Sequence, residues 1–145
     1  MIRCSDVDLA IALRDRSLPE GSLVFVAEPT IPDQWAAVAA ELSEAFELSQ
    51  AAVRGGGAVA YLVNSDDLLG RRGPGRAMVA CGLLSAARSL AIETARAGVP
   101  VNVVAVSEST SPEIAGYWVE MLCRPDGPNG ELIRLSGDHL GKTVP

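Results

Sequence analysis

Three arginines in a short glycine-rich stretch form the most concentrated basic group of the chain. The stretch reads GRRGPGR, and its arginines are Arg71, Arg72 and Arg76. Guanidinium groups bind phosphates and carboxylates through paired hydrogen bonds, so this loop could hold a phosphopantetheine, a nucleotide or an acidic partner surface. The more ordinary interpretation, which we favour, is a solvated loop whose glycines make the turn.

The segment GDHLGKT, near the end of the chain, looks at first like a phosphate-binding loop. Such a loop needs four residues between its glycines and a helix after its last residue, whereas this segment has three and is followed by two residues. His139, the only histidine, lies in the same tail. The cysteines are three and widely spaced: Cys4, Cys81 and Cys123. We expect no nucleotide loop, no metal site, and reduced structural thiols.

Length and composition favour one globular domain that spans residues 1–145. Apolar residues make up 48% of the 145 residues, and the formal net charge is −6. A net negative charge disfavours binding to nucleic acid. No uninterrupted apolar run reaches the roughly 18 residues that a membrane-spanning helix needs. Asp6 and Asp8 lie where a secretory signal would have its apolar centre. We therefore expect a cytoplasmic protein that binds neither nucleic acid nor membrane.

Hydrophobic periodicity predicts an alternation of strands and helices. Short β-branched runs predict strands at Ser22–Pro29, Gly57–Val63, Pro100–Val106 and Gly130–Ser136, with a further short strand possible at residues 2–7. Helices are expected between them, at Asp33–Val53, Ala77–Ala97 and Ser111–Cys123, with a weak one ending near Asp15. Such an alternation is typical of a three-layer α/β fold with a mostly parallel sheet of four or five strands.

One predicted helix, Ala77–Ala97, is apolar around most of its circumference. No charged residue occurs between Arg76 and Arg88. A helix of this kind must be covered on all sides, and a domain of this size has little chain left to cover its outer face. We expect a partner subunit there.

The segment LLSAARSLAIETARAGVPVNVVAV resembles the helix and strand that follow the active-site tyrosine in short-chain dehydrogenases/reductases (SDRs). Other segments are similar to further parts of the family in the same order. SLVFVAEP matches its fourth strand, GGGAVAYLVNS its fifth, and GELIRLSGD its seventh. The resemblance covers about residues 22–138 and is weak over residues 1–21, where IRCSDV is similar to the end of the third strand; residues 139–145 are a tail. It implies a Rossmann-like fold.

The resemblance also places the family's catalytic residues, and most of them are absent. The positions of its tyrosine and lysine, twelve and eight residues before Arg88, hold Arg76 and Ala80. The position of its proton-relaying asparagine holds Glu41. Ser65 is the best match for its serine, with the neighbouring Asn64 as the alternative. An arginine stays protonated and cannot replace the tyrosine as the acid in hydride transfer.

The nucleotide site is missing on separate grounds. A dinucleotide fold needs a glycine-rich turn between its first strand and first helix, and the chain contains no G-x-G-x-x-G. GGG at Gly55–Gly57 precedes a strand and is expected to be a helix stop and turn. The sequence thus predicts a truncated SDR fold, the oligomerising half without the nucleotide-binding half, which binds no NAD(H), no NADP(H) and no other cofactor.

Three functions remain open at this point. The favoured one is a non-catalytic SDR-like protein that acts by association, as a homodimer or as a structural or regulatory subunit beside a full-length SDR. The second is a cofactor-independent isomerase, hydratase or lyase that uses Glu41 as a base and Arg76 as an oxyanion clamp. The third is a small-molecule or acyl-carrier binding protein.

The resemblance implies where association would occur. In the family, the helices matching Asp33–Val53 and Ala77–Ala97 pack against their copies in a second subunit. We expect an obligate dimer through these two helices. The candidate contact residues, some of which could face the sheet instead, are Leu42, Phe46, Leu83, Leu84 and Ala87.

Overall fold

A five-stranded parallel sheet forms the centre of the protein in a computed structural model, which describes residues 1–137. The strands lie in the order β1-β2-β3-β4-β5, and every neighbouring pair is parallel. Their bounds are Ile2–Arg3 for β1, Leu23–Val26 for β2, Val59–Asn64 for β3, Val101–Val106 for β4 and Leu132–Leu135 for β5. The predicted parallel α/β sheet is therefore confirmed.

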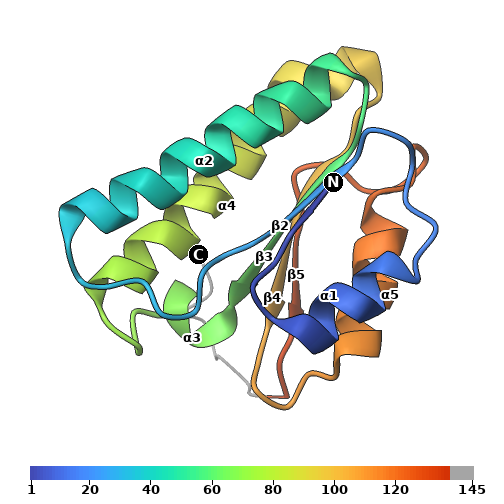
Figure 1. The fold of residues 1–145 in the computed structure, drawn as a ribbon. Helices are drawn as coiled ribbons and strands as arrows, with labels where there is room; N and C mark the ends of the chain where they lie inside the picture. The colour runs from blue at the N-terminus through green and yellow to red at the C-terminus, as the bar shows by residue number, and fades with distance from the viewer. Residues whose placement is uncertain (138–145) are drawn as a thin grey trace.

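Helices cover both faces of this sheet (Figure 1). The long helices α2 and α4 pack on one face, and the shorter α1 and α5 pack on the other. Their bounds are Val7–Arg14 for α1, Trp35–Arg54 for α2, Ser65–Leu68 for α3, Pro74–Thr94 for α4 and Pro112–Leu122 for α5; a 3₁₀ turn, Ala95–Ala97, extends α4.

The path of the chain through the sheet is unusual in its handedness. Successive strands always step in the same direction across the sheet, yet α1 and α5 lie on the face opposite to α2 and α4. Two strand–helix–strand connections that move in the same direction across the sheet, but whose helices lie on opposite faces, must have opposite crossover handedness. Two of the four connections therefore depart from the right-handed crossover found in roughly 98% of parallel units.

The core consists of two apolar layers separated by the sheet. Alternate residues of β3 belong to different layers: Tyr61 faces α2 and α4, whereas Leu62 faces α1 and α5. Both are almost completely buried. A strand buried on both faces must be apolar throughout, which explains the continuous apolar runs from which the strands were predicted.

The ends of the helices follow from local capping, with one difference from expectation. Ser111 caps α5 with Pro112 in its first turn, and α2 ends at Arg54 before the glycine turn, both as predicted. Asp33, expected at the start of α2, instead accepts a hydrogen bond from the backbone N–H of Gly75, with 2.7 Å between N and Oδ1. Its carboxylate thus caps α4, whose own N-cap residue is a glycine.

One helix segment, Pro74–Ala97, is long and apolar enough to cross a membrane, with a mean hydropathy of 1.3 over its best window. Core helices of soluble proteins have the same property. Here Val79, Leu83 and Ala87 of this helix are buried against the sheet. A single helix of this kind therefore carries little weight as a sign of membrane insertion.

Candidate functional site

Ser65 lies directly after β3, at the carboxyl edge of the parallel sheet. It is the first residue of α3, and the neighbouring Asn64 caps that turn by accepting a hydrogen bond from the N–H of Asp66. Ser65 is only 3% exposed, and its hydroxyl has no hydrogen-bond partner among the described residues. The position that resembles the family's catalytic serine is therefore covered.

The arginine loop contains its own counter-ions. Arg71 contacts Asp66 at 2.9 Å, and the Nε of Arg72 lies 3.5 Å from Oδ1 of Asp67. Asp67 is 6% exposed. Burial raises the pKa of Asp67, although the positive charges of Arg72 and Arg76 oppose the shift. Two of the three arginines thus face carboxylates, which weakens the attraction of this loop for a bound anion.

Glu41 is buried on α2 and engaged on both carboxylate oxygens. The guanidinium of Arg3 donates to Oε1 at 3.0 Å and to Oε2 at 2.6 Å. The backbone N–H of Glu28 donates to Oε1 at 2.9 Å. The same guanidinium lies 4.6 Å from the centre of the Phe25 ring. The arrangement connects β1 to α2. Its three hydrogen bonds use both acceptor sites of Oε1 and one of Oε2, and they favour the ionised carboxylate, so Glu41 is poorly placed to accept a proton as a general base.

Ala80, at the position of the family's lysine, packs in the core of the α2–α4 layer and is 1% exposed. Arg76 lies in the first turn of α4. The pocket between α2 and α4, described below, is lined by neither Arg76 nor Glu41. The alternative enzyme would require Arg76 and Glu41 to face one closed pocket. The pocket between α2 and α4 does not bring them together.

The turn between β1 and α1 joins an edge strand of the sheet to the helix that follows it. Here the turn consists of Cys4, Ser5 and Asp6. The carboxylate of Asp6 accepts a hydrogen bond from the N–H of Leu9 at 2.9 Å and so caps the helix. A helix N-terminus binds phosphate through free N–H groups and positive polarity, both of which a capping carboxylate reduces.

The α2–α4 face differs from the predicted contact surface. Leu83, Leu84 and Ala87 are at most 5% exposed and pack in the core against the sheet, so they are the candidates that face the sheet rather than solvent. Leu42 is half-buried. Phe46, in contrast, is 63% exposed. Three further large apolar side chains on these two helices are exposed: Trp35 at 71%, Met78 at 46% and Ile92 at 79%.

The outer stripe of α4 shows which of the candidate residues face inward. Three polar residues lie on the solvent-facing side of this helix: Ser85, Arg88 and Ser89. Residues three or four positions apart share one face of a helix, so these three define its exposed side. The leucines beside them must then face inward. This polar stripe was a usable signal, but it was masked because nearly every other residue of the helix is apolar.

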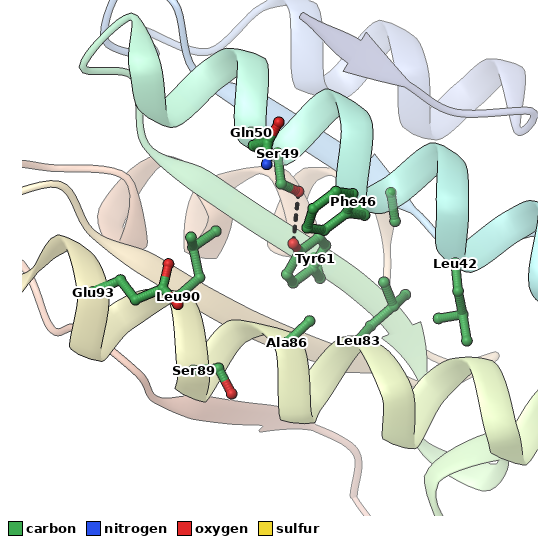
Figure 2. A pocket seen from close by; sticks show the side chains of 11 residues that line it. Leu42, Phe46, Ser49, Gln50, Tyr61, Leu83, Ala86, Ser89, Leu90 and Glu93 are labelled. Carbon is green, nitrogen blue, oxygen red and sulfur yellow. Dashed lines mark hydrogen bonds between the residues drawn. The ribbon is translucent and has the colours of Figure 1, made fainter.

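A pocket with a volume of about 210 Å³ lies between α2 and α4, above β3 (Figure 2). On its floor, the hydroxyls of Ser49 and Tyr61 are 2.6 Å apart. Burial raises the pKa of Tyr61, although the hydrogen bond with Ser49 opposes the shift. The residues around the pocket are Leu42, Ala45, Phe46, Ser49, Gln50, Tyr61, Leu83, Ala86, Ser89, Leu90 and Glu93.

The cysteines have separate environments. Cys123 is buried, and burial raises its pKa to about 12, which keeps the thiol protonated and inert. Cys81 is exposed on α4, whereas a structural thiol was expected there. Within residues 1–137 no group of three or more metal-ligating side chains comes together. His139 and most of the GDHLGKT segment lie outside the described residues.

A scan of known protein families and a search of curated proteins found no match. Solved structures do match. An SDR-family oxidoreductase from Burkholderia thailandensis has a TM-score of 0.67 and 20% identity over 90% of this chain and 69% of its own. An enoyl-[acyl-carrier-protein] reductase (NADH) from Aquifex aeolicus has a TM-score of 0.65 and 16% identity over 79% and 61%.

A 3-hydroxyacyl-CoA dehydrogenase type-2 from Mycobacterium avium is similar at a TM-score of 0.64 and 15% identity, over 80% of this chain and 66% of its own. The chain thus spans about two thirds of the length of these enzymes. At such low identity the likeness concerns the fold alone. The protein has the Rossmann-like α/β fold of short-chain dehydrogenase/reductase structures.

Proposed function

We propose that this protein is a non-catalytic, SDR-like protein that acts by association, as a homodimer or as a structural or regulatory subunit of a full-length SDR. The observation that carries the proposal is the α2–α4 face. Its four exposed large apolar side chains are Trp35, Phe46, Met78 and Ile92. Large apolar side chains gathered on one face are typical of a surface that binds another protein.

The size of the face is suitable for a stable contact. α2 and α4 are helices of 20 and 21 residues that lie side by side (Figure 1). A standard interface buries about 800 Å² on each partner. Small exposed residues on α4, among them Cys81, Ser85 and Ala86, allow a second helix to approach closely while Phe46 and Ile92 supply apolar area.

Two features support the absence of hydride transfer. Arg76 and Ala80 stand at the positions where the resemblance places the tyrosine and the lysine. Asp6 caps α1, the helix that follows the first strand, with a carboxylate, which disfavours phosphate binding at that helix N-terminus. The cofactor-independent enzyme has less support, because Arg3 and the Glu28 N–H already occupy the carboxylate of Glu41.

The proposal is tested by the substitution Phe46→Glu. Phe46 is mostly exposed, so a glutamate is tolerated in the folded subunit but places an unpaired charge in the contact. The variant is expected to run as a folded monomer in light scattering, with an unchanged circular dichroism spectrum. Leu84→Glu would not serve, because Leu84 is buried against the sheet and the change would unfold the protein.

Ile114→Glu is the matched control. Ile114 is 51% exposed on α5, on the opposite side of the sheet, so the same chemical change is made away from the proposed contact. It is expected to leave the molar mass as in the wild type. Equal masses for all three proteins would contradict association through α2 and α4.

A further inference from the structure

The pocket between α2 and α4 has features of a ligand site that contact with a second subunit does not require. Tyr61 rises from β3 into the gap between the helices, where its hydroxyl meets Ser49 of α2 (Figure 2). Phe46 and Leu90 stand on either side of this pair (Figure 2). The pocket therefore has a polar floor and apolar walls.

The hydroxyl pair has an unused donor. Ser49 is 3% exposed and Tyr61 is 1% exposed, and the two oxygens share one hydrogen bond. Two hydroxyls carry two protons, and one is used between them. Within residues 1–137 neither oxygen makes a further hydrogen bond. A buried O–H without an acceptor is unfavourable, and an acceptor atom in the pocket would satisfy it.

The lining residues determine the charge and size of a suitable ligand. No lysine or arginine lines the pocket, whereas Glu93 stands at one end, so an anion would be repelled. A cavity of roughly 150 Å³ holds benzene. The volume of about 210 Å³ is therefore suitable for one ring with a short substituent.

We propose that the pocket binds a small neutral molecule that has one apolar ring and one hydrogen-bond acceptor, with the acceptor directed at the Ser49–Tyr61 hydroxyl pair and the ring between Phe46, Ala86 and Leu90. This site goes beyond the proposed association and does not depend on it. A bound molecule would lie between the two helices that form the proposed subunit contact. Ligand binding and oligomeric state can therefore be measured on the same sample.

The test uses acetophenone and cumene as probes, because they have nearly the same shape and only acetophenone has an acceptor oxygen. Each is titrated into isotopically labelled protein while NMR signals are followed. We expect saturable shifts for residues around the pocket and a dissociation constant for acetophenone that is roughly threefold to tenfold lower than for cumene, the effect of one neutral hydrogen bond.

Three variants make the test specific. Tyr61→Phe is expected to abolish the preference for acetophenone, and Ser89→Ala, which removes a hydroxyl at the rim, is expected to preserve it. Ala86→Leu changes an exposed residue and should block both probes by filling the pocket. Equal affinity of the wild type for the two probes, no saturable shift, or shifts only elsewhere on the protein would overturn the proposal.

Light scattering of the same samples separates the two hypotheses. A monomer that binds acetophenone with the expected preference would contradict association and support the ligand site. A dimer that shows no saturable shift would overturn the ligand site and leave association in place.

Discussion

Arg3 and Glu41 form a partly buried ion pair with a structural role. Their ion pair joins the edge strand β1 to the long helix α2 across 38 positions of sequence. The Arg3 side chain is 21% exposed and that of Glu41 is 6% exposed, so water screens the pair only in part. Burial lowers the pKa of Arg3, but the bonds to Glu44 and Glu41 outweigh it and raise the pKa overall.

Substituting Glu41 with glutamine should therefore reduce the free energy of unfolding. The variant keeps the shape of the side chain but leaves Arg3 without its partly buried counter-ion, which costs about 1–3 kcal/mol. Glu44→Gln removes the exposed partner of the same guanidinium and should cost about 0–1 kcal/mol. Urea denaturation measures both. Similar values for the two variants would contradict the structural role of Glu41.

Asp67 should make stability depend on pH. Burial raises its pKa above the ordinary value of 3.8, so the folded state holds the proton more tightly than the unfolded state. The contribution of Asp67 is then complete below the ordinary pKa and is lost as the pH rises through the raised pKa. We expect the stability of the wild type relative to Asp67→Asn to fall as the pH rises above the ordinary value of 3.8, as measured by urea denaturation. A relative stability that rises with pH would contradict this.

Single side chains were the hardest features to predict from the sequence. The strand residues could be assigned to the core because a parallel strand is apolar on both faces. Which way Leu83 and Leu84 face could not be assigned as easily, because hydrophobic periodicity indicates no buried side for a helix that is apolar around most of its circumference. The capping role of Asp33 at α4 depends on a contact 42 positions away in sequence.

At the scale of elements, the N-terminal β1–α1 unit protects an edge of the sheet. β1 pairs in parallel with β2, and α1 buries Leu13 against the α5 side of the sheet. The sequence led us to expect a short strand at residues 2–7 and a weak helix that ends near Asp15, and β1 and α1 lie there. The short α3 was not predicted, because four residues after a strand show no helical period.

Deleting residues 1–16 should make the protein insoluble. The deletion exposes the edge of β2, a strand of Leu, Val, Phe and Val, and uncovers Val24 and the inner side of α5. Unpaired apolar edges promote aggregation. Expression followed by separation of soluble and insoluble fractions measures the effect. A soluble deletion variant with the wild-type circular dichroism spectrum would contradict the protective role.

At the scale of the whole molecule, the sequence predicted the fold well because its strands and helices alternate at spacings that only a parallel α/β sheet satisfies. Function was less accessible. The positions that resemble catalytic residues are spread over α2, α3 and α4. Only the structure shows that the carboxylate of Glu41 is bound by Arg3 and that the side chain of Ser65 is buried.

The chain should not bind NAD(H) or NADP(H) with useful affinity. Asp6 caps the helix after β1 with a carboxylate, and negative charge at that position opposes a pyrophosphate. Isothermal titration calorimetry with each nucleotide should show no saturable heat. A dissociation constant in the low micromolar range, equivalent to roughly −8 kcal/mol, would contradict this expectation.

The molar mass of the wild-type protein in solution tests the central claim most directly. Association through α2 and α4 predicts that light scattering at micromolar concentration gives twice the chain mass of 15.1 kDa. The exposed Trp35, Phe46, Met78 and Ile92 are then buried in the contact. A folded species of 15.1 kDa at that concentration would contradict self-association of the chain through these two helices.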